Sequence, residues 1–330
     1  MPTMQNADAS GARAATPVAI PAVGWKQILL RSWREAGNDN LGLIASGVAF
    51  CAILAMVPAL GALVMTYGLV ATPETVASNI GSLTAMMPED AARLIGEQLA
   101  NVVSTSDGKK GFGLIIALGI ALYGVMKGAS ALITALNIAY DEEETRSFIR
   151  VNLLAFSIAV GSVLVAILAM IAIAAMAAVE AMFPAAPPFL TGLAKLASYL
   201  VVGIVGSGMA AGVYRYGPDR AHAKWKWLTP GSIFASLSWI LITFGFGLYV
   251  ANFGNYDATY GSLGAAMVLL TWLYLSAYTL LLGAELNCEI ERQTARDTTT
   301  GPELPMGERG AYAADTVAAE VDGNRQASAS

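Results

Sequence analysis

The apolar residues of this chain gather in long runs separated by short polar stretches. Six runs are long enough to cross a hydrocarbon layer about 30 Å thick, which takes about 20 helical residues. Each must be helical, because a lipid-exposed strand leaves backbone groups unpaired and the runs lack the alternation of an outer-membrane barrel. The pattern predicts an all-α, polytopic membrane protein with a six-transmembrane-helix bundle, whose spans cover residues 41–70, 112–138, 151–179, 193–214, 230–251 and 262–287.

The Lys and Arg residues between the runs predict which side of the membrane each connection faces. Cytoplasmic connections carry an excess of these residues. The excess occurs before the first run, after the second, after the fourth and after the sixth, whereas residues 180–192 and 252–261 contain neither Lys nor Arg. The long 71–111 connection contains only Arg93, Lys109 and Lys110. This alternation predicts an even number of spans and two cytoplasmic termini.

The segments outside the runs have their own patterns. Residues 1–24 are small and polar without an apolar core, so they predict a disordered N-terminal tail and not a cleaved signal peptide. Residues 293–330 predict a disordered cytoplasmic tail, which leaves residues 25–292 as the transmembrane domain. Within 71–111, a helix-start signal precedes apolar residues at helical spacing, which predicts amphipathic helices on the outer surface.

The composition agrees with a membrane solvent and narrows the chemistry. Hydrophobic residues make up 56% of the chain and charged residues 13%, outside the range of soluble domains. The two cysteines, Cys51 and Cys288, cannot build a disulfide framework, and with one histidine, His222, we expect no metal site. No nucleotide-binding loop or redox-cofactor motif is visible, so we expect no cofactor.

Lys127 is the most informative single position, because it lies about 22 Å along the second run from its start. An ionisable side chain at that depth faces the bundle interior or a wet cavity, and it is a functional candidate by default. The alternative is a structural lysine that binds helix carbonyls. The sequence leaves both readings open.

Polar residues form a stripe on each of two runs. In the second run they recur at spacings of four and three residues, which places them on one face of a helix, and the sixth run carries a second stripe. Two such faces can line a route through the membrane, or they can bond packed helices together. Glu285 lies near the cytoplasmic end, so we expect no direct contact with Lys127. The candidate pathway residues are Tyr123, Lys127, Ser130, Thr134 and Asn137 in the second run, and Tyr274, Tyr278 and Glu285 in the sixth.

Two connections are candidate surface sites. The segment after the fourth run combines bases with aromatic side chains, which predicts anchoring to anionic headgroups by Arg215, Arg220, Lys224, Trp225, Lys226 and Trp227. The outer connection before the sixth run is short, polar and aromatic. It predicts either the mouth of a cavity or a tight turn with interfacial tyrosines, formed by Asn255, Tyr256, Asp257 and Tyr260.

Three segments resemble the YihY/BrkB family of bacterial inner-membrane proteins, over roughly residues 25–292. They are Tyr140-Asp-Glu-Glu-Glu-Thr-Arg, Tyr214-Arg-Tyr-Gly-Pro-Asp-Arg with Pro230-Gly231, and Asn255-Tyr-Asp-Ala-Thr-Tyr-Gly-Ser-Leu-Gly with Leu282-Gly-Ala-Glu-Leu-Asn. The resemblance implies a six-helix protein of the bacterial inner membrane and cell envelope, without an established activity. The family has also been called ribonuclease BN. This sequence gives that name no support, because it lacks clustered histidines and carboxylates and a basic nucleic-acid groove.

These observations lead to two functional hypotheses. The first is a transporter or flux protein for a lipid or another amphipathic envelope component, in which Lys127 neutralises an anionic group. The second is a non-transporting scaffold whose loops and tails recruit envelope proteins. We expect no enzymatic activity, because no nucleophile, base and orienting group can be assembled from these side chains. The expected partners are the lipid bilayer and its amphipathic molecules or an envelope protein, and not nucleic acid.

Overall fold

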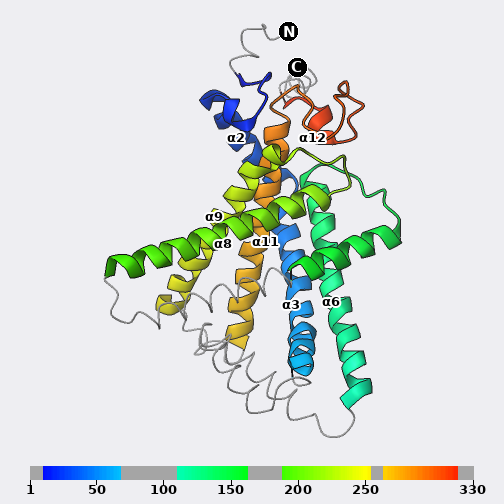
Figure 1. Cartoon of the computed structure of the whole chain (residues 1–330), viewed down its shortest axis with the longest axis vertical. Coiled ribbons are helices and arrows are strands. Elements are labelled where there is room, and N and C mark those ends of the chain that lie inside the picture. The colour runs from blue at the N-terminus through cyan, green and yellow to red at the C-terminus, as the bar shows by residue number, and fades with distance from the viewer. Residues whose placement is uncertain (1–9, 68–109, 163–187, 254–262, 319–330) are drawn as a thin grey trace. The chain divides into compact units, whose positions relative to one another are not determined.

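A computed structural model describes residues 10–67, 110–162, 188–253 and 263–318 (Figure 1). These residues form helices and turns. Within them, Ala223 and Thr299 form an isolated β-bridge. The all-α prediction therefore holds for the described residues. A further helix covers Phe148–Ser162. The labelled elements are η1 (Pro17–Ala19), α2 (Ala22–Asn38), α3 (Leu41–Tyr67), α6 (Lys110–Ala139), α8 (Pro188–Tyr216), α9 (Trp225–Phe253), α11 (Leu263–Glu291) and α12 (Tyr312–Asp315).

Several helices are long and apolar enough to cross a membrane. Within the described residues, three meet this criterion alone, over Leu122–Ala139, Trp225–Val250 and Ala266–Glu291. Helices α2 and α3 meet it together as a pair bent by 65°, which gives up to four candidate spans. The predicted total of six spans remains a prediction. The predicted amphipathic helices of the first outer connection fall on residues 68–109, outside the described residues.

The chain divides into two compact units, and the division falls within α3, α6, α9 and α11. Unit 1 comprises residues 1–44, 133–240 and 278–330, and unit 2 comprises residues 45–132 and 241–277. Unit 1 therefore holds η1, α2, the Phe148–Ser162 helix, α8, α12 and one end of each of the four divided helices. We describe each unit by itself.

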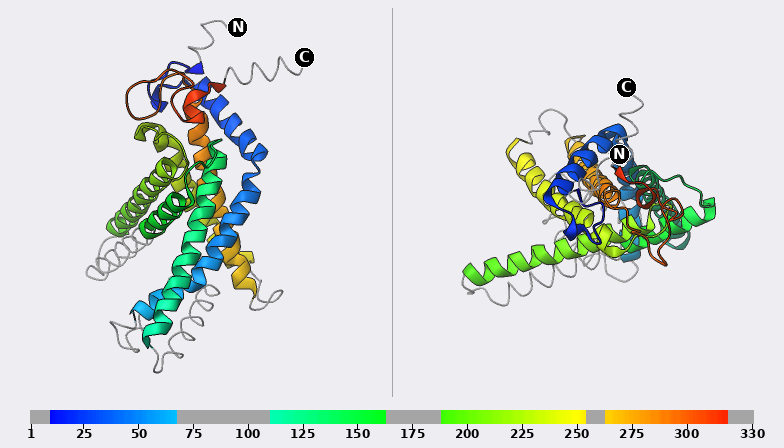
Figure 2. Two further views of the ribbon diagram at one scale, coloured as in Figure 1. Left: turned by 90° about the vertical axis from the view of Figure 1, so that its right-hand side faces the viewer. Right: turned by 90° about the horizontal axis from the view of Figure 1, so that it is seen from above.

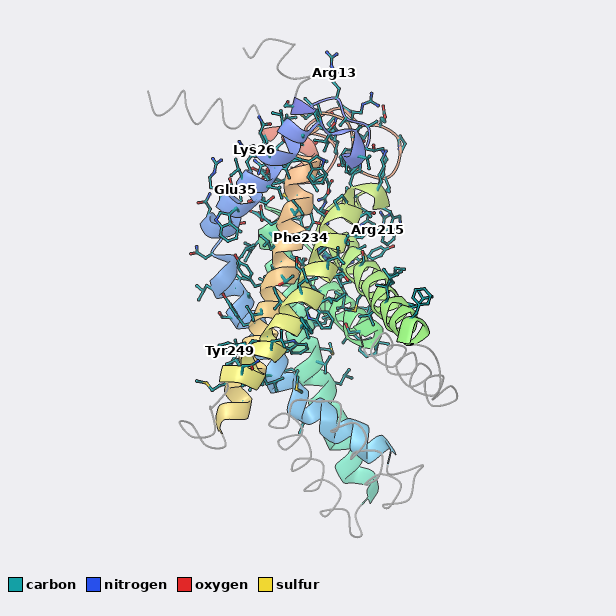
Figure 3. All side chains as sticks on the ribbon, turned by 90° about the vertical axis from the view of Figure 1, so that its left-hand side faces the viewer. Arg13, Lys26, Glu35, Arg215, Phe234 and Tyr249 are labelled. Atoms are coloured by element: carbon teal, nitrogen blue, oxygen red, sulfur yellow. The ribbon has the colours of Figure 1, made fainter. Side chains whose placement is uncertain are left out.

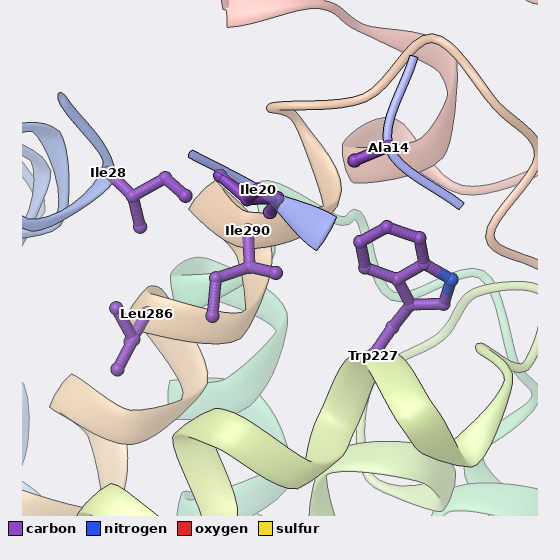
Figure 4. Packing of buried hydrophobic residues seen from close by; sticks show 6 residues of the cluster. All are labelled: Ala14, Ile20, Ile28, Trp227, Leu286 and Ile290. Atoms are coloured by element: carbon purple, nitrogen blue, oxygen red, sulfur yellow. The ribbon is translucent and has the colours of Figure 1, made fainter. Parts of the chain in front are cut away.

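The apolar core of unit 1 joins the N-terminal segment to α9 and α11. Trp227 of α9 is 1% exposed and packs with residues from the other two segments (Figure 4). Residues 10–24, which the sequence places in a disordered tail, are ordered here. Small apolar side chains explain the difference, since they fit against the end of α11 despite the polar composition around them. The cluster contains Ala14, Ile20, Ile28, Trp227, Leu286 and Ile290.

The segment after α11 is also ordered, as far as residue 318, and α12 lies beside the end of α11 (Figures 1 and 2). Arg309 donates hydrogen bonds to the carbonyl oxygens of Leu304, Ala314 and Ala295. The Asp315 carboxylate accepts hydrogen bonds from neighbouring backbone N–H groups. The sequence predicts disorder from residue 293 because composition does not reveal these side-chain-to-backbone bonds, which satisfy the backbone of an irregular segment.

Helices α9 and α11 approach closely at two glycines of unit 1. A Cβ atom on Gly231 would overlap the Gly283 carbonyl oxygen, and a Cβ on Gly283 would lie 2.5 Å from the Tyr214 hydroxyl. The Asn287 side chain accepts a hydrogen bond from the Gly231 amide and donates one to the Leu228 carbonyl. These bonds occupy backbone groups beside Pro230, which lies inside α9. The helix begins at Trp225, five residues before the predicted run.

Candidate functional site

The last turns of α11 carry two buried carboxylates, each held by arginine. Glu289 is fully buried, and it accepts hydrogen bonds from Arg31 of α2 and from Arg292, which follows α11. Arg31 also donates to the Gln293 side chain at 2.6 Å. One carboxylate therefore faces two guanidinium groups, and this ion pairing fixes α2 to the end of α11. Because the charge of Glu289 is shared with two buried guanidinium groups, we interpret this cluster as structural.

The second carboxylate, Glu291, pairs with Arg220 of the segment that follows α8. Nη1 and Nη2 of Arg220 lie 3.1 and 2.7 Å from the two carboxylate oxygens, a bidentate geometry. Glu291 also accepts a hydrogen bond from the Thr298 hydroxyl at 2.7 Å. The guanidinium carbon lies 5.0 Å from the centroid of the Tyr140 ring. This ion pair joins the ends of α6, α8 and α11 with the chain beyond α11.

A second network fastens the segment after α6 to the segment after α8. Asn137 donates to Glu144 at 2.9 Å and accepts from the Asp219 amide at 2.8 Å. Arg146 donates to Glu144 and to the Gly217 carbonyl. The hydrogen bonds from Arg146 hold the pKa of the Glu144 carboxyl below its usual value. Residues 137–146 and 214–220, which are separate in sequence, therefore form one polar clasp in unit 1.

The polar stripe of the second run divides in the structure. Tyr123 and Lys127 are exposed, with Nζ of Lys127 5.4 Å from the Tyr123 ring centroid. Ser130 is half-buried and Thr134 is exposed. Asn137 is buried within the clasp. Tyr123, Lys127 and Ser130 lie in unit 2, whereas Thr134 and Asn137 lie in unit 1.

The polar positions of the sixth run also differ in environment. Tyr274 and Tyr278 are half-buried. Glu285 is 2% exposed, and within the described residues its Oε2 atom has no hydrogen-bond partner. Tyr274 belongs to unit 2, and Tyr278 and Glu285 belong to unit 1.

The predicted headgroup-anchoring residues do not all reach the surface. Trp225 is 50% exposed, and the Arg215 guanidinium lies 4.9 Å from its ring centroid, so these two side chains offer a basic and aromatic surface. Arg220 and Trp227 are buried at 9% and 1% exposure, in the ion pair with Glu291 and in the apolar core. Arg220 and Trp227 are therefore structural, because they contact other parts of the protein in place of the lipid headgroups that the sequence predicts.

The remaining candidates of that segment are the two lysines. The ammonium groups of Lys224 and Lys226 donate to the carbonyl oxygens of Asp297 and Ala15. The predicted outer-loop mouth, at Asn255, Tyr256, Asp257 and Tyr260, lies outside the described residues. Within the described ranges, no group of three His, Cys, Asp or Glu side chains is arranged to hold a metal ion.

Sequence reasoning missed the three residues that organise unit 1, namely Arg31, Glu289 and Glu291. The only available signal was acidic residues placed directly at the end of an apolar run, where an unpaired charge is costly. Arg31 lies among the Lys and Arg residues before the first run, which their distribution assigns to the cytoplasmic side. Its burial became visible only when its partner, 258 positions later in the chain, was placed beside it.

The hydrogen bond between Glu142 and the start of α12 is expected to depend on pH. The Glu142 carboxylate accepts a 2.8 Å hydrogen bond from the Tyr312 amide, and burial raises its pKa to about 7. Because the docked state binds the proton more tightly than the free state, docking is strongest below the unperturbed pKa and weakens as the pH rises through about 7. Hydrogen exchange at residues 311–318, corrected for intrinsic rates, should therefore show less protection at pH 8 than at pH 6.

A matched pair of variants tests this assignment. Glu142→Gln keeps an oxygen acceptor but cannot ionise, so it should remove the pH dependence, whereas Glu143→Gln at the exposed neighbouring position should retain it. If protection in the Glu142→Gln variant still falls over the same pH range, another group controls the docking.

Long apolar helices define the chain as an integral helical membrane protein. The chain belongs to the family described as Virulence factor BrkB, which matches residues 32–306. The predicted family membership is thereby confirmed. No solved structure matches the chain.

Three bacterial relatives show how far the similarity extends. The ribonuclease-like protein YfkH of Bacillus subtilis is 34% identical over 190 residues, which cover 55% of this chain and 67% of that protein. A UPF0761 membrane protein of Pseudoalteromonas translucida is 32% identical over 143 residues, 37% of this chain and 47% of that protein. Another, from Delftia acidovorans, is 26% identical over 283 residues, 81% of this chain and 64% of that protein. The chain thus spans less than two thirds of these two membrane proteins.

Proposed function

We propose that this protein is a flux protein of the bacterial inner membrane, with six spans and cytoplasmic termini, that moves an anionic amphipathic molecule such as a lipid along α6. The single observation that carries the proposal is the position of Lys127, an exposed base within a helix that is otherwise apolar enough to span a membrane. A charge at that depth needs water, a counter-ion or an anionic ligand.

The local structure of unit 2 favours a ligand over a purely structural lysine. Within the described residues, the contact of the Lys127 ammonium is with the face of Tyr123, which is itself 64% exposed. The neighbouring face of α6 performs the packing, since a Cβ on Gly124 would lie 3.2 Å from Cα of Ala55 in α3. Lys127 and Tyr123 together present a cation and an aromatic surface, which suit an anionic headgroup joined to an apolar chain.

Replacement of Lys127 is therefore expected to abolish most of the flux while leaving the fold intact. The protein is reconstituted in vesicles that contain a fluorescent anionic phospholipid, and movement between leaflets is followed by chemical quenching of the outer leaflet. Lys127→Met should lose most of the protein-dependent rate, and Lys127→Arg should retain a substantial part because the charge remains. Arg150→Met, at an exposed base of unit 1, is the matched control. A normal rate for correctly folded Lys127→Met would rule out this route.

A non-transporting scaffold is the second candidate, and the ordered chain beyond α11 favours it. Residues 293–318 form a folded surface on unit 1. A partner protein can bind such a surface without the entropic cost of ordering a disordered tail. A photo-crosslinker at exposed Glu308 and another at Tyr123 separate the two functions. Capture of one defined envelope protein at Glu308, with no lipid at Tyr123, supports the scaffold. Capture of lipid at Tyr123 supports flux.

We assign no enzymatic step and no nucleic-acid partner to the protein. His222 packs edge-on against Tyr216, with 5.1 Å between ring centroids, and burial lowers the pKa of the imidazole. A proton-transfer role needs a base and an acid placed around one substrate. The charged neighbours of His222 are the arginines Arg215, Arg220 and Arg146, which stay protonated and so do not supply that pair.

A further inference from the structure

Helix α2 turns large apolar side chains outward and buries an arginine, which is unusual for a helix that is bathed in water. Its exposed side carries large apolar residues, with exposures of 59% for Val23, 53% for Leu29, 58% for Leu30 and 69% for Trp33. Its buried side includes a charged and a hydroxyl side chain, and consists of Gly24, Ile28, Arg31, Ser32 and Ala36. A surface helix in water usually turns such large apolar residues inward and its arginines outward.

The buried side is fixed, so α2 cannot rotate to hide its apolar residues. Arg31 is held by the Glu289 carboxylate and by Gln293. Ile28 is fully buried in the core cluster with Leu286 and Ile290. A rotation that buried Trp33 would therefore separate a buried ion pair and open the core. The apolar side must find its contacts outside the described part of the chain.

The connection from α2 to α3 indicates what covers this side. Only Asp39 and Asn40 separate the two helices, which meet at 65°, and Asn40 adopts a left-handed backbone with φ of 54° (Figure 2). When α3 crosses the bilayer, the bend tilts α2 away from the membrane normal at the depth where α3 enters. That level is the lipid headgroup layer, and the apolar side of α2 is therefore continuous with the bilayer surface that α3 enters.

The charges on the exposed side of α2 fit the same surface. Lys26 and Arg34 are exposed, and Lys26 lies along α2 in Figure 3. Bases beside large apolar side chains and a tryptophan are the pattern of helices that lie in a membrane interface, where anionic lipids attract the bases. Glu35, the acid of the same helix, is half-buried and lies apart from the apolar side.

We propose that α2 is an interfacial helix, which lies in the headgroup layer at the α3 entry point with Val23, Leu29, Leu30 and Trp33 immersed at the acyl boundary and Lys26 and Arg34 on anionic headgroups. The partner is the bilayer itself. Through Arg31 and Glu289, the helix couples the lipid surface directly to the polar networks at the end of α11. This inference rests on α2 and on its connection to α3, and it does not depend on whether Lys127 serves lipid flux.

The depth of α2 can be measured with spin labels on the full chain in lipid nanodiscs. The half-buried Cys51 is replaced by alanine, and the buried Cys288 is left in place. A label at Leu30→Cys should be accessible to oxygen and protected from a water-soluble nickel chelate. A label at Glu308→Cys, an exposed position of the segment beyond α11, should show the reverse. Nickel access at both positions would overturn the proposal, and so would shielding of Leu30→Cys from both reagents, which would indicate a protein partner or a second copy.

The lipid charge provides a second, separate readout. The Leu30→Cys label should lie deeper in nanodiscs of phosphatidylglycerol and phosphatidylcholine than in phosphatidylcholine alone. Combining it with Lys26→Gln and Arg34→Gln should remove this difference while the label remains oxygen-accessible. A full difference in the charge-neutral variant would overturn the assignment of these two bases to anionic headgroups.

Discussion

Replacing Glu291 by glutamine is expected to lower the free energy of unfolding by about 3–5 kcal/mol, the usual cost of removing one partner from a buried ion pair. Glutamine fills the same volume, so the loss reports charge and hydrogen bonding and not a cavity. Arg220 would remain buried with its guanidinium unpaired, and the Thr298 hydroxyl would lose a charged acceptor. Denaturant titration of the detergent-solubilised protein measures the change. Glu303→Gln, at an exposed position, should leave stability unaltered.

A double variant separates the charge effect from the packing effect. When both partners become apolar, no buried charge is left without a counter-ion, and such replacements are often neutral. Arg220→Met combined with Glu291→Leu should therefore recover most of the stability that Glu291→Gln loses. If the double variant is less stable than the single variant, the pair contributes through geometry that no apolar pair reproduces.

Gly231→Ala is expected to destabilise the protein by about 3 kcal/mol, through overpacking together with two disturbed buried hydrogen bonds. The new methyl group would overlap the Gly283 carbonyl and lie 2.5 Å from the Asn287 side chain. Helix α9 would have to move away from α11, which would break the hydrogen bond that the Gly231 amide donates to Asn287 and the one that Asn287 donates to the Leu228 carbonyl. The yield of folded protein and its thermal unfolding temperature in detergent both measure the effect.

Another glycine of α9 gives the matched control. A Cβ on Gly247 has no neighbour within 4 Å, so Gly247→Ala should preserve stability or raise it slightly, because alanine is the better helix former. Gly283→Ala should reproduce the loss, since its Cβ would lie 2.7 Å from the Gly231 carbonyl. Equal stability of the Gly231→Ala and Gly247→Ala variants would contradict the close approach of the two helices.

The polar residues of this protein lie in different environments. In unit 1, Glu289 and Glu291 pair with arginines and hold helix ends and connecting segments together, whereas the Oε2 atom of Glu285 has no hydrogen-bond partner within the described residues. In unit 2, Lys127 is exposed and meets an aromatic ring in place of a carboxylate. A sequence shows both kinds as polar residues near or within apolar runs. Only the partners distinguish them, and the partners are distant in sequence.

The resemblance in sequence already pointed to the regions that unit 1 brings together. Asp219 and Arg220 of one segment, Glu144 of another and Asn287 of a third all carry side-chain hydrogen bonds in unit 1. Their roles were not visible, because Arg220 beside aromatic residues has the same local pattern as a headgroup anchor. A lipid anchor and a buried ion pair differ in burial, which local sequence does not encode.

The sequence by itself determined the class of protein and, within the described residues, roughly where its long apolar helices lie. Hydrophobic length and the absence of alternation are enough for this, because the bilayer forces every spanning backbone to satisfy its own hydrogen bonds. The tertiary structure decided which charges are paired and buried, how residues 10–24 and 293–318 pack in unit 1, and which side chains of α2 are buried. These features depend on contacts between segments up to 258 positions apart, such as Arg31 with Glu289, and no local pattern specifies such a pairing.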